Sequence, residues 1–252
     1  MVADITAVLR MLANGKFAGA DILLRKLGID PAMVDKVTPD DALIVTFSGH
    51  GWAAPDGAFY LLASDTRWPA SADAPDRNSA LGTSLLVPLI DMINAGEMVI
   101  IIDACHSAAS VATLEFKPGP MGDASLGQLA YDKKIRILAA TQGDDVALET
   151  AKLGQGLLSY VLAVDAFKPG GGARTHDASG RLRLDEWLRY AAARLPKLSE
   201  EVKTSAANTG AGDDDGGLVF VNRAKVVAKA QEPSLFDFTG TNSPVTFGNA
   251  GR

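Results

Sequence analysis

Two short polar stretches of the sequence carry the residue types of a thiol–imidazole pair. His50, one of only three histidines, lies in the stretch IVTFSGHGW at positions 44–52. Cys105, the single cysteine, lies in the stretch IIIDACHSA at positions 100–108. Because a free thiol is only a few per cent thiolate at neutral pH, a histidine within reach activates it by taking its proton, and later protonates a leaving amine. Such a pair suits attack on a peptide carbonyl, provided that the two side chains meet.

Each stretch comes directly after an apolar run that is typical of a buried strand. These runs are residues 42–47 and 98–102. The carboxyl ends of parallel strands lie at one edge of a sheet, and this edge is where such folds place their sites. If the two strands are parallel neighbours, His50 and Cys105 emerge at the same edge. The sequence therefore predicts that the two residues meet.

The backbone around the pair also suits acyl transfer. Gly49 and Gly51 flank His50 and would let the backbone approach a substrate carbonyl. The N–H groups of Gly51 and Cys105 are the natural donors to an oxyanion. The structural alternatives are that a lone cysteine is a small core residue and that a histidine between glycines belongs to a turn. The presence of both at one predicted edge favours the catalytic interpretation.

The rest of the pattern alternates strands with helices. Residues 58–63 form a second extended run that Gly57 joins to the first as a hairpin, and residues 135–140 form a third buried strand. Residues 218–221 are the last candidate strand. Amphipathic or apolar helices are predicted at residues 5–12, 21–28, 84–95, 124–132, 156–167 and 184–195, the last ending at Pro196. This alternation predicts an α/β fold, a three-layer α/β/α sandwich with a mainly parallel sheet.

Composition argues against several classes of partner. The chain of 252 residues has a net charge of −6 and no run rich in Lys and Arg, so nucleic acid is not expected as a partner. No apolar run approaches the roughly 20 residues of a membrane span. The first residues show no signal-peptide pattern, and one cysteine cannot form an internal disulfide. We therefore expect a cytoplasmic protein that does not bind a membrane.

Taken together, the two stretches resemble the motifs of the caspase-like cysteine peptidases, the clan that includes caspases, metacaspases and prokaryotic relatives. The resemblance lies in SGHG at 48–51 and DACHS at 103–107, and their separation is close to the roughly 50 residues expected. A weaker third match is AATQGDDVALE at 139–149, followed by GQG at 154–156. The resemblance implies a cysteine endopeptidase that acts on peptide or protein substrates. His50 would be the base, and Cys105 the nucleophile that forms an acyl-enzyme.

The resemblance also implies a substrate specificity. In metacaspase-like enzymes an acid two residues before the nucleophile lines the primary specificity pocket, beside a serine two residues before the histidine. These positions correspond to Asp103 and Ser48, and Asp144 would border the cleft. An anionic pocket favours Arg or Lys before the scissile bond. The alternative for Asp103 is an Asx turn or a cap for the next helix, and Ser48 by itself is typical of a turn.

Acidic residues further along the chain raise the question of calcium, which some metacaspase-like enzymes require. Asp144, Asp145 and Glu149 could border the cleft, bind calcium or form a solvated face. They match no known calcium-binding loop, so the solvated face is the favoured interpretation. We expect no cofactor and no metal site.

Two departures from the family pattern bear on activity. Ala108 stands where the motif usually ends in Gly, and the chain starts within what should be the second helix of the family. We therefore expect residues 1–203 to be an N-terminally truncated peptidase domain, and residues 204–252 to be a flexible acidic spacer and C-terminal extension. Without the missing strands, 42–47 becomes a sheet edge that invites pairing. The expected partner there is an upstream segment of a longer chain or a second copy in a dimer, and the alternative function is a catalytically silent caspase-like scaffold or signalling module.

Overall fold

A six-stranded sheet forms the centre of the protein, in the order β10-β5-β4-β1-β2-β3. The computed structural model describes residues 36–82, 85–106, 124–140, 149–150, 155–168, 173, 181–208, 218–219 and 233–247. Three parallel strands make the middle of the sheet: β1 (Ala42–Ala53), β4 (Glu97–His106) and β5 (Arg136–Ala139). These are the strands that the three apolar runs predicted, and the chain is a mixed α/β protein.

The two flanks of the sheet are antiparallel, so the expected parallel arrangement holds at its centre. On one side β2 (Phe59–Leu62) pairs with the end of β1, and β3 (Leu81–Gly82) pairs with β2. The turn between β1 and β2 contains Gly57 with a positive φ of 91°, a conformation that glycine adopts without strain. The predicted hairpin is therefore confirmed. On the other side, β10 (Ser234–Asp237) pairs with β5.

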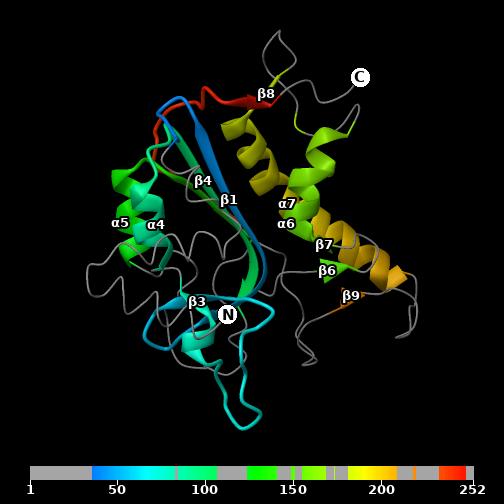
Figure 1. Cartoon of the computed structure of the whole chain (residues 1–252). Helices are drawn as coiled ribbons and strands as arrows, with labels where there is room; N and C mark the ends of the chain where they lie inside the picture. The colour runs from blue at the N-terminus through cyan, green and yellow to red at the C-terminus, as the bar shows by residue number, and fades with distance from the viewer. Residues whose placement is uncertain are drawn as a thin grey trace.

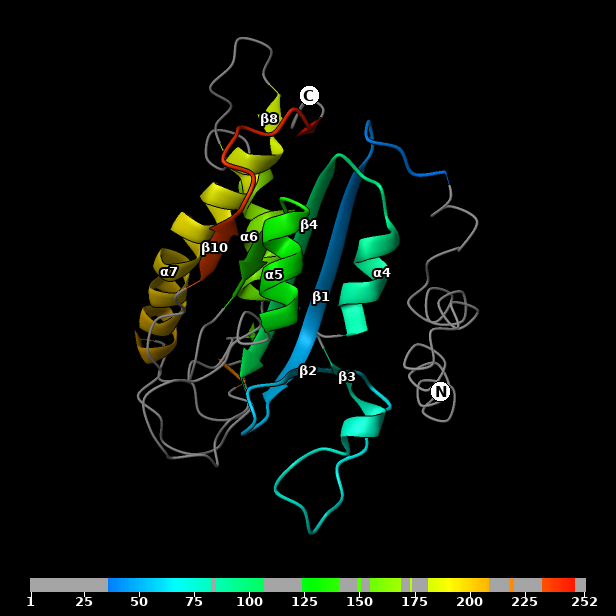
Figure 2. The same cartoon turned by 90° about the vertical axis from the view of Figure 1, so that its left-hand side faces the viewer.

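Four α-helices accompany the sheet in the described part of the chain. They are α4 (Leu86–Met92), α5 (Ala124–Asp132), α6 (Leu157–Ala163) and α7 (Leu184–Asn208). Residues of β4 alternate between two apolar clusters: Ile100 packs in one cluster with α4 and α5, and Val99 packs in the other with α6 and α7. Figure 1 shows the two helix pairs on opposite sides of β1 and β4, and Figure 2 looks onto the side that α4 and α5 occupy.

The helix α7 is longer than the sequence predicted. It was expected to stop at Pro196, yet it continues to Asn208 with the proline inside. A proline within a helix removes a backbone hydrogen bond and costs about 3 kcal/mol. Burial continues beyond it, because Leu198 is 8% exposed and Ser199 is fully buried. Packing of this second half offsets the cost of the proline, and the prediction of a stop was wrong.

Asp165 ties the end of α6 to α7. It follows α6 in a short 3-10 helix (Asp165–Phe167) and accepts hydrogen bonds from the Tyr190 hydroxyl (2.6 Å), Arg194 Nε (3.0 Å) and Lys168 Nζ (3.1 Å). Burial acts to raise the pKa of Asp165, but these hydrogen bonds outweigh it and the pKa lies below its ordinary value. Burial and the bond to Asp165 raise the pKa of Tyr190 to about 12. The end of α6 is thereby fixed to α7.

Residues 233–247 pack against the sheet and α7. Besides β10, they supply β11 (Thr246–Phe247), which pairs with β8 (Leu182–Arg183) at the start of α7. The ring of Phe247 lies 4.9 Å from that of Trp187, measured between centroids. The boundary expected at residue 204 lies within the range of α7, and the division into a peptidase domain and a C-terminal extension stays a prediction. The strands β10 and β11 are too short for their apolar residues to show a detectable alternation in the sequence.

The strand β1 has a partner on only one side for much of its length, within the residues that the structure describes. Residues 42–51 pair with β4, whereas β2 reaches only residues 50–53. Over residues 42–49 the side chains alternate between half-buried and exposed, and Ile44 is 36% exposed. The partner expected at this edge, an upstream segment or a second copy, stays a prediction.

Three remaining expectations concern smaller elements. The strand predicted at 218–221 is β9 (Leu218–Val219), which joins β6 (Glu149–Thr150) and β7 (Gln155–Gly156) in a separate small sheet. The helices predicted at 5–12 and 21–28 lie outside the described residues. Among the helices that are described, none has the length and apolar character needed to cross a membrane.

Candidate functional site

The two predicted catalytic residues are register partners in adjacent parallel strands. His50 of β1 is paired with Cys105 of β4, and two residues earlier Ser48 is paired with Asp103. Neighbouring strands lie about 4.8 Å apart. Both pairs lie at the carboxyl ends of the two strands, as the topological argument predicted. The backbone thus places the histidine and the cysteine side by side, while their catalytic roles stay predictions.

The strands extend further into the motifs than the sequence predicted. The apolar runs of the sequence end near residues 47 and 102, but the pairing of β1 with β4 continues to Gly51 and His106. Continued pairing satisfies the backbone polar groups of these residues, which a buried loop would leave without partners. The motif residues are consequently held by a sheet rather than by two loops, which gives their backbone a fixed relative position.

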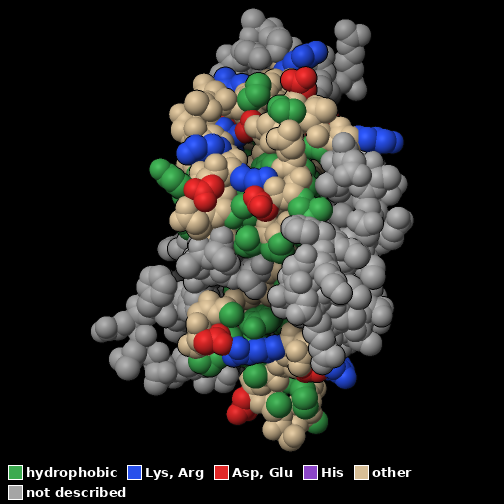
Figure 3. Space-filling view, turned by 60° about the vertical axis from the view of Figure 1, so that its left-hand side comes forward, with side chains coloured by type: hydrophobic (Ala, Val, Ile, Leu, Met, Phe, Trp, Pro, Cys, Tyr) green, Lys and Arg blue, Asp and Glu red, His purple; other side chains and the backbone are tan. Residues whose placement is uncertain are grey.

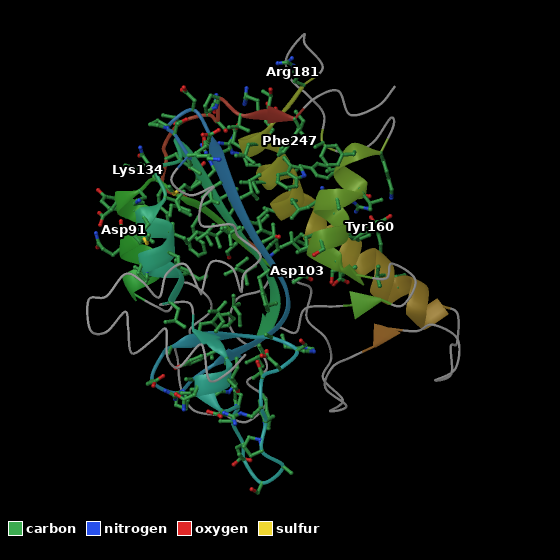
Figure 4. The ribbon with its side chains drawn as sticks, viewed as in Figure 1. Asp91, Asp103, Lys134, Tyr160, Arg181 and Phe247 are labelled. Carbon is green, nitrogen blue, oxygen red and sulfur yellow. The ribbon has the colours of Figure 1, made fainter. Side chains whose placement is uncertain are left out.

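Asp103 is the buried acid of this site. The residue is 4% exposed, and its Oδ2 atom accepts hydrogen bonds from the backbone N–H (2.9 Å) and the hydroxyl (2.5 Å) of Ser159. Ser159 lies in the first turn of α6, where backbone N–H groups need acceptors from outside the helix. Figure 4 shows Asp103 between the sheet and α6. Its carboxylate therefore caps α6, whereas the alternative that the sequence left open was a cap for the next helix along the chain. The part of Asp103 in substrate specificity stays a prediction.

Gly156 makes room for this carboxylate. It is the N-cap residue of α6 and provides no side-chain cap of its own. A Cβ atom at this position would fall well inside van der Waals contact with the carboxylate of Asp103. The glycine noted in the GQG match thus has a physical reason here: the acid of β4 takes the place that an N-cap side chain would otherwise occupy.

Ser159 connects the two residues that were predicted to form the specificity pocket. Its hydroxyl oxygen lies 3.4 Å from that of Ser48, which is exposed, and 2.5 Å from Oδ2 of Asp103. Sequence reasoning assigned no role to Ser159. The signal that could have found it is the interval from Gly156, which puts a serine at the third helical position, where an N–H seeks an acceptor.

An aromatic and charged cluster braces the hairpin that follows His50. The guanidinium of Arg77 lies 5.3 Å from the ring centroid of Trp52 and 5.6 Å from that of Tyr60. Arg77 also forms an ion pair with Asp56, and this hydrogen bond holds the pKa of Asp56 below its usual value. Because Trp52 and Tyr60 are register partners, the cluster fixes the pairing of β1 with β2 beside the site.

Several predicted residues fall where the structure gives no description. Asp144, Asp145 and Ala108 lie outside the described residues, and Glu149 is described only by its backbone in β6. Across the described ranges, no group of three or more His, Cys, Asp or Glu side chains is arranged to hold a metal ion. On the face shown in Figure 3, basic and acidic side chains are interspersed rather than gathered by sign. The expectations about calcium and about nucleic acid stay predictions.

Comparison with known proteins adds no relative. No protein-family model and no curated protein matches this chain. The resemblance to caspase-like peptidases therefore depends on the residues themselves, chiefly the motifs at 48–51 and 103–107.

Proposed function

We propose that the protein is a caspase-like cysteine endopeptidase that cleaves after Arg or Lys. The observation that carries the proposal is the parallel register that pairs His50 with Cys105 at the carboxyl ends of β1 and β4. The two apolar clusters on either side of β4 support the three-layer α/β/α architecture that such a peptidase requires.

The proposed reaction divides peptide hydrolysis into two steps. His50 takes the proton of the Cys105 thiol, and the thiolate sulfur forms a bond to the carbonyl carbon of the substrate. The C–N bond then breaks, the amine leaves with the proton from the imidazole, and a thioester remains on the enzyme. Water, deprotonated by the same imidazole, attacks the thioester and releases the acid and the free thiol. The N–H groups of Gly51 and Cys105 are the proposed donors to the oxyanion of both steps.

The proposed specificity comes from the second register pair. Asp103 supplies a buried carboxylate in the strand beside Ser48, and Ser48 is exposed at the same end of the sheet. A cationic side chain of the substrate would meet the serine hydroxyl first and be attracted by the carboxylate behind it. Because that carboxylate is largely removed from water, its attraction for a cation is screened less than at an open surface.

Replacement of the nucleophile tests the proposal. We expect Cys105→Ala and His50→Ala to reduce cleavage of an arginine-containing peptide to background, with melting temperatures within a few degrees of the wild type. A thiol-directed peptide probe with arginine at its reactive end should label the wild-type chain and not Cys105→Ala. Cleavage by Cys105→Ala would refute the mechanism, and unfolding of that variant would mean that the cysteine is structural.

The same experiment separates the proposal from the scaffold alternative. One observation favours a scaffold: within the described residues, β1 presents residues 42–49 without a strand on their outer side. A sheet edge of this kind can bind another chain without any chemistry. A folded wild-type chain that neither cleaves the peptide nor reacts with the probe would support that alternative function.

A further inference from the structure

Ser159 is the residue through which α6 holds the acid of the site. Its backbone N–H and its hydroxyl both donate to one oxygen of Asp103, at 2.9 and 2.5 Å. The N–H alone is enough to cap the helix. The hydroxyl bond is therefore an additional constraint, and it fixes the direction of the carboxylate rather than the start of the helix.

The hydroxyl of Ser159 also determines how Ser48 presents its oxygen. A hydroxyl has one proton to donate, and the 2.5 Å bond assigns that proton to Asp103. The oxygen of Ser159 lies 3.4 Å from the hydroxyl oxygen of Ser48. With its own proton given to Asp103, the Ser159 hydroxyl has only lone pairs left to offer to Ser48. When Ser48 directs its own proton toward Ser159, the lone pairs of the Ser48 oxygen are left for a donor that approaches from solvent.

Burial increases along the same series of residues, from Ser48 through Ser159 to Asp103. Ser48 is exposed, Ser159 is half-buried, and Asp103 is 4% exposed. A cationic side chain arriving at this end of the sheet thus meets an oriented hydroxyl oxygen in front of a fixed carboxylate. The charged groups of arginine and lysine offer only N–H donors. The hydroxyl oxygen of Ser48 and the carboxylate of Asp103 are both acceptors, so they suit these side chains.

We propose that Ser159 is a positioning residue for the binding of a cationic substrate side chain, an inference that rests on the peptidase function proposed above. It fixes the carboxylate of Asp103 and orients the hydroxyl of Ser48 as an acceptor. Loss of its hydroxyl weakens binding of the cation without changing the chemistry at the scissile bond. Its effect is on KM and not on kcat.

The test uses the full chain and two peptides that differ in one group. One peptide has arginine before the scissile bond, and the other has citrulline, which has nearly the same shape and no charge. We expect Ser159→Ala to raise KM for the arginine peptide about tenfold, the scale of one hydrogen bond in a charged network, while kcat changes less than about twofold. KM for the citrulline peptide should stay nearly constant. Ser159→Thr, which keeps the hydroxyl, should retain the wild-type preference within about threefold.

Three outcomes would overturn the inference. Equal losses of Ser159→Ala on the two peptides would show a purely structural role for the hydroxyl. An unchanged preference for arginine in Ser159→Ala would show that the carboxylate needs no such support, and would leave the proposed function intact. A folded wild-type chain that cleaves neither peptide would remove the proposed function and this inference together.

Discussion

The two ends of β4 both contain a buried carboxylate, and they differ in what surrounds it. At the amino end, Glu97 forms an ion pair with Arg136 of β5, which is itself fully buried and also pairs with Asp237 of β10. At the carboxyl end, Asp103 accepts hydrogen bonds from the neutral amide and hydroxyl of Ser159. One end joins three strands through opposite charges, and the bonds described at the other end join a strand to a helix through neutral donors.

This difference indicates how one strand can serve two purposes. The guanidinium of Arg136 is enclosed by acceptors, with the Thr239 hydroxyl and the Thr241 carbonyl each at 2.6 Å in addition to the two carboxylates. Such a cluster contributes to the fold and offers nothing to a ligand. At the other end, exposed Ser48 and His50 lie beside the buried acid, so polar groups there face solvent. Chemistry is expected at the end whose polar groups are accessible.

The largest expected effect is on stability. A substitution at the amino end of β4 should lower the free energy of unfolding much more than a substitution at the carboxyl end. Arg136→Met removes the cation and leaves Glu97 buried without its partner, and breaking a buried ion pair in this way costs about 3–5 kcal/mol of unfolding free energy. Asp103→Asn keeps an oxygen that can accept from Ser159, so its cost should be about 1 kcal/mol. Denaturant unfolding of both variants, with unchanged m-values, measures the difference.

The substrate specificity of the same two variants should show the reverse: Asp103→Asn should change it and Arg136→Met should not. Asp103→Asn removes the anionic charge proposed to bind arginine, and we expect kcat/KM for an arginine peptide to fall at least about tenfold relative to the matched citrulline peptide. Arg136→Met should leave that ratio unchanged at a temperature where it is folded. A stability loss larger for Asp103→Asn than for Arg136→Met, or a wild-type preference for aspartate, would contradict the assignment of the two ends.

A second prediction uses a glycine at each end. A Cβ atom at Gly96 would overlap the backbone carbonyl oxygen of Pro39, whereas a Cβ at Gly156 would overlap the side chain of Asp103. We expect Gly156→Ala to cost about 1–3 kcal/mol, as overpacking usually does, and Gly96→Ala to cost at least as much. Only the clash at Gly156 involves a side chain that a second substitution can shorten.

The control for this prediction is a double-mutant cycle. In the Asp103→Ala background the carboxylate is absent, so Gly156→Ala should cost about 1 kcal/mol less than it does in the wild type. Gly96→Ala should cost the same in both backgrounds, because its obstacle is backbone. Equal costs of Gly156→Ala with and without Asp103 would show that the glycine is required for another reason.

The sequence predicted the centre of this fold because its signals are local. The apolar runs at 42–47, 98–102 and 135–140 mark strands that are in the sheet, and Gly57 marks a turn with positive φ. The neighbouring positions of His50 and Cys105 followed from these runs and from the rule for parallel strands. A register between two strands is determined by patterns that each strand carries separately.

Other features depend on contacts between distant segments, which a local pattern does not contain. The bonds from Ser159 to Asp103 join residues 56 positions apart, and β10 is a four-residue strand paired with β5. The continuation of α7 past Pro196 reflects packing that outweighs the local preference against proline in a helix. Asp103 could therefore be named from the sequence as a candidate, while its contact with α6 could not, and its role in specificity stays a prediction.

The smallest expected effect is a difference in pH dependence that traces to the amino end of β4. Burial acts to raise the pKa of Asp237, but hydrogen bonds from the Thr239 hydroxyl and N–H and the charge of Arg136 outweigh it, so the pKa lies below its ordinary value of 3.8. A carboxyl with a lowered folded-state pKa contributes stability that is present above its unfolded pKa and is lost as pH falls through the folded pKa.

We expect the unfolding free energy to be nearly constant between about pH 5 and 7 and to decrease below about pH 4. Asp237→Asn should flatten part of that acid decrease. Denaturant titrations at a series of pH values measure the slopes, and an acid slope of Asp237→Asn equal to that of the wild type would show that the charged cluster of Arg136 does not depend on this carboxylate.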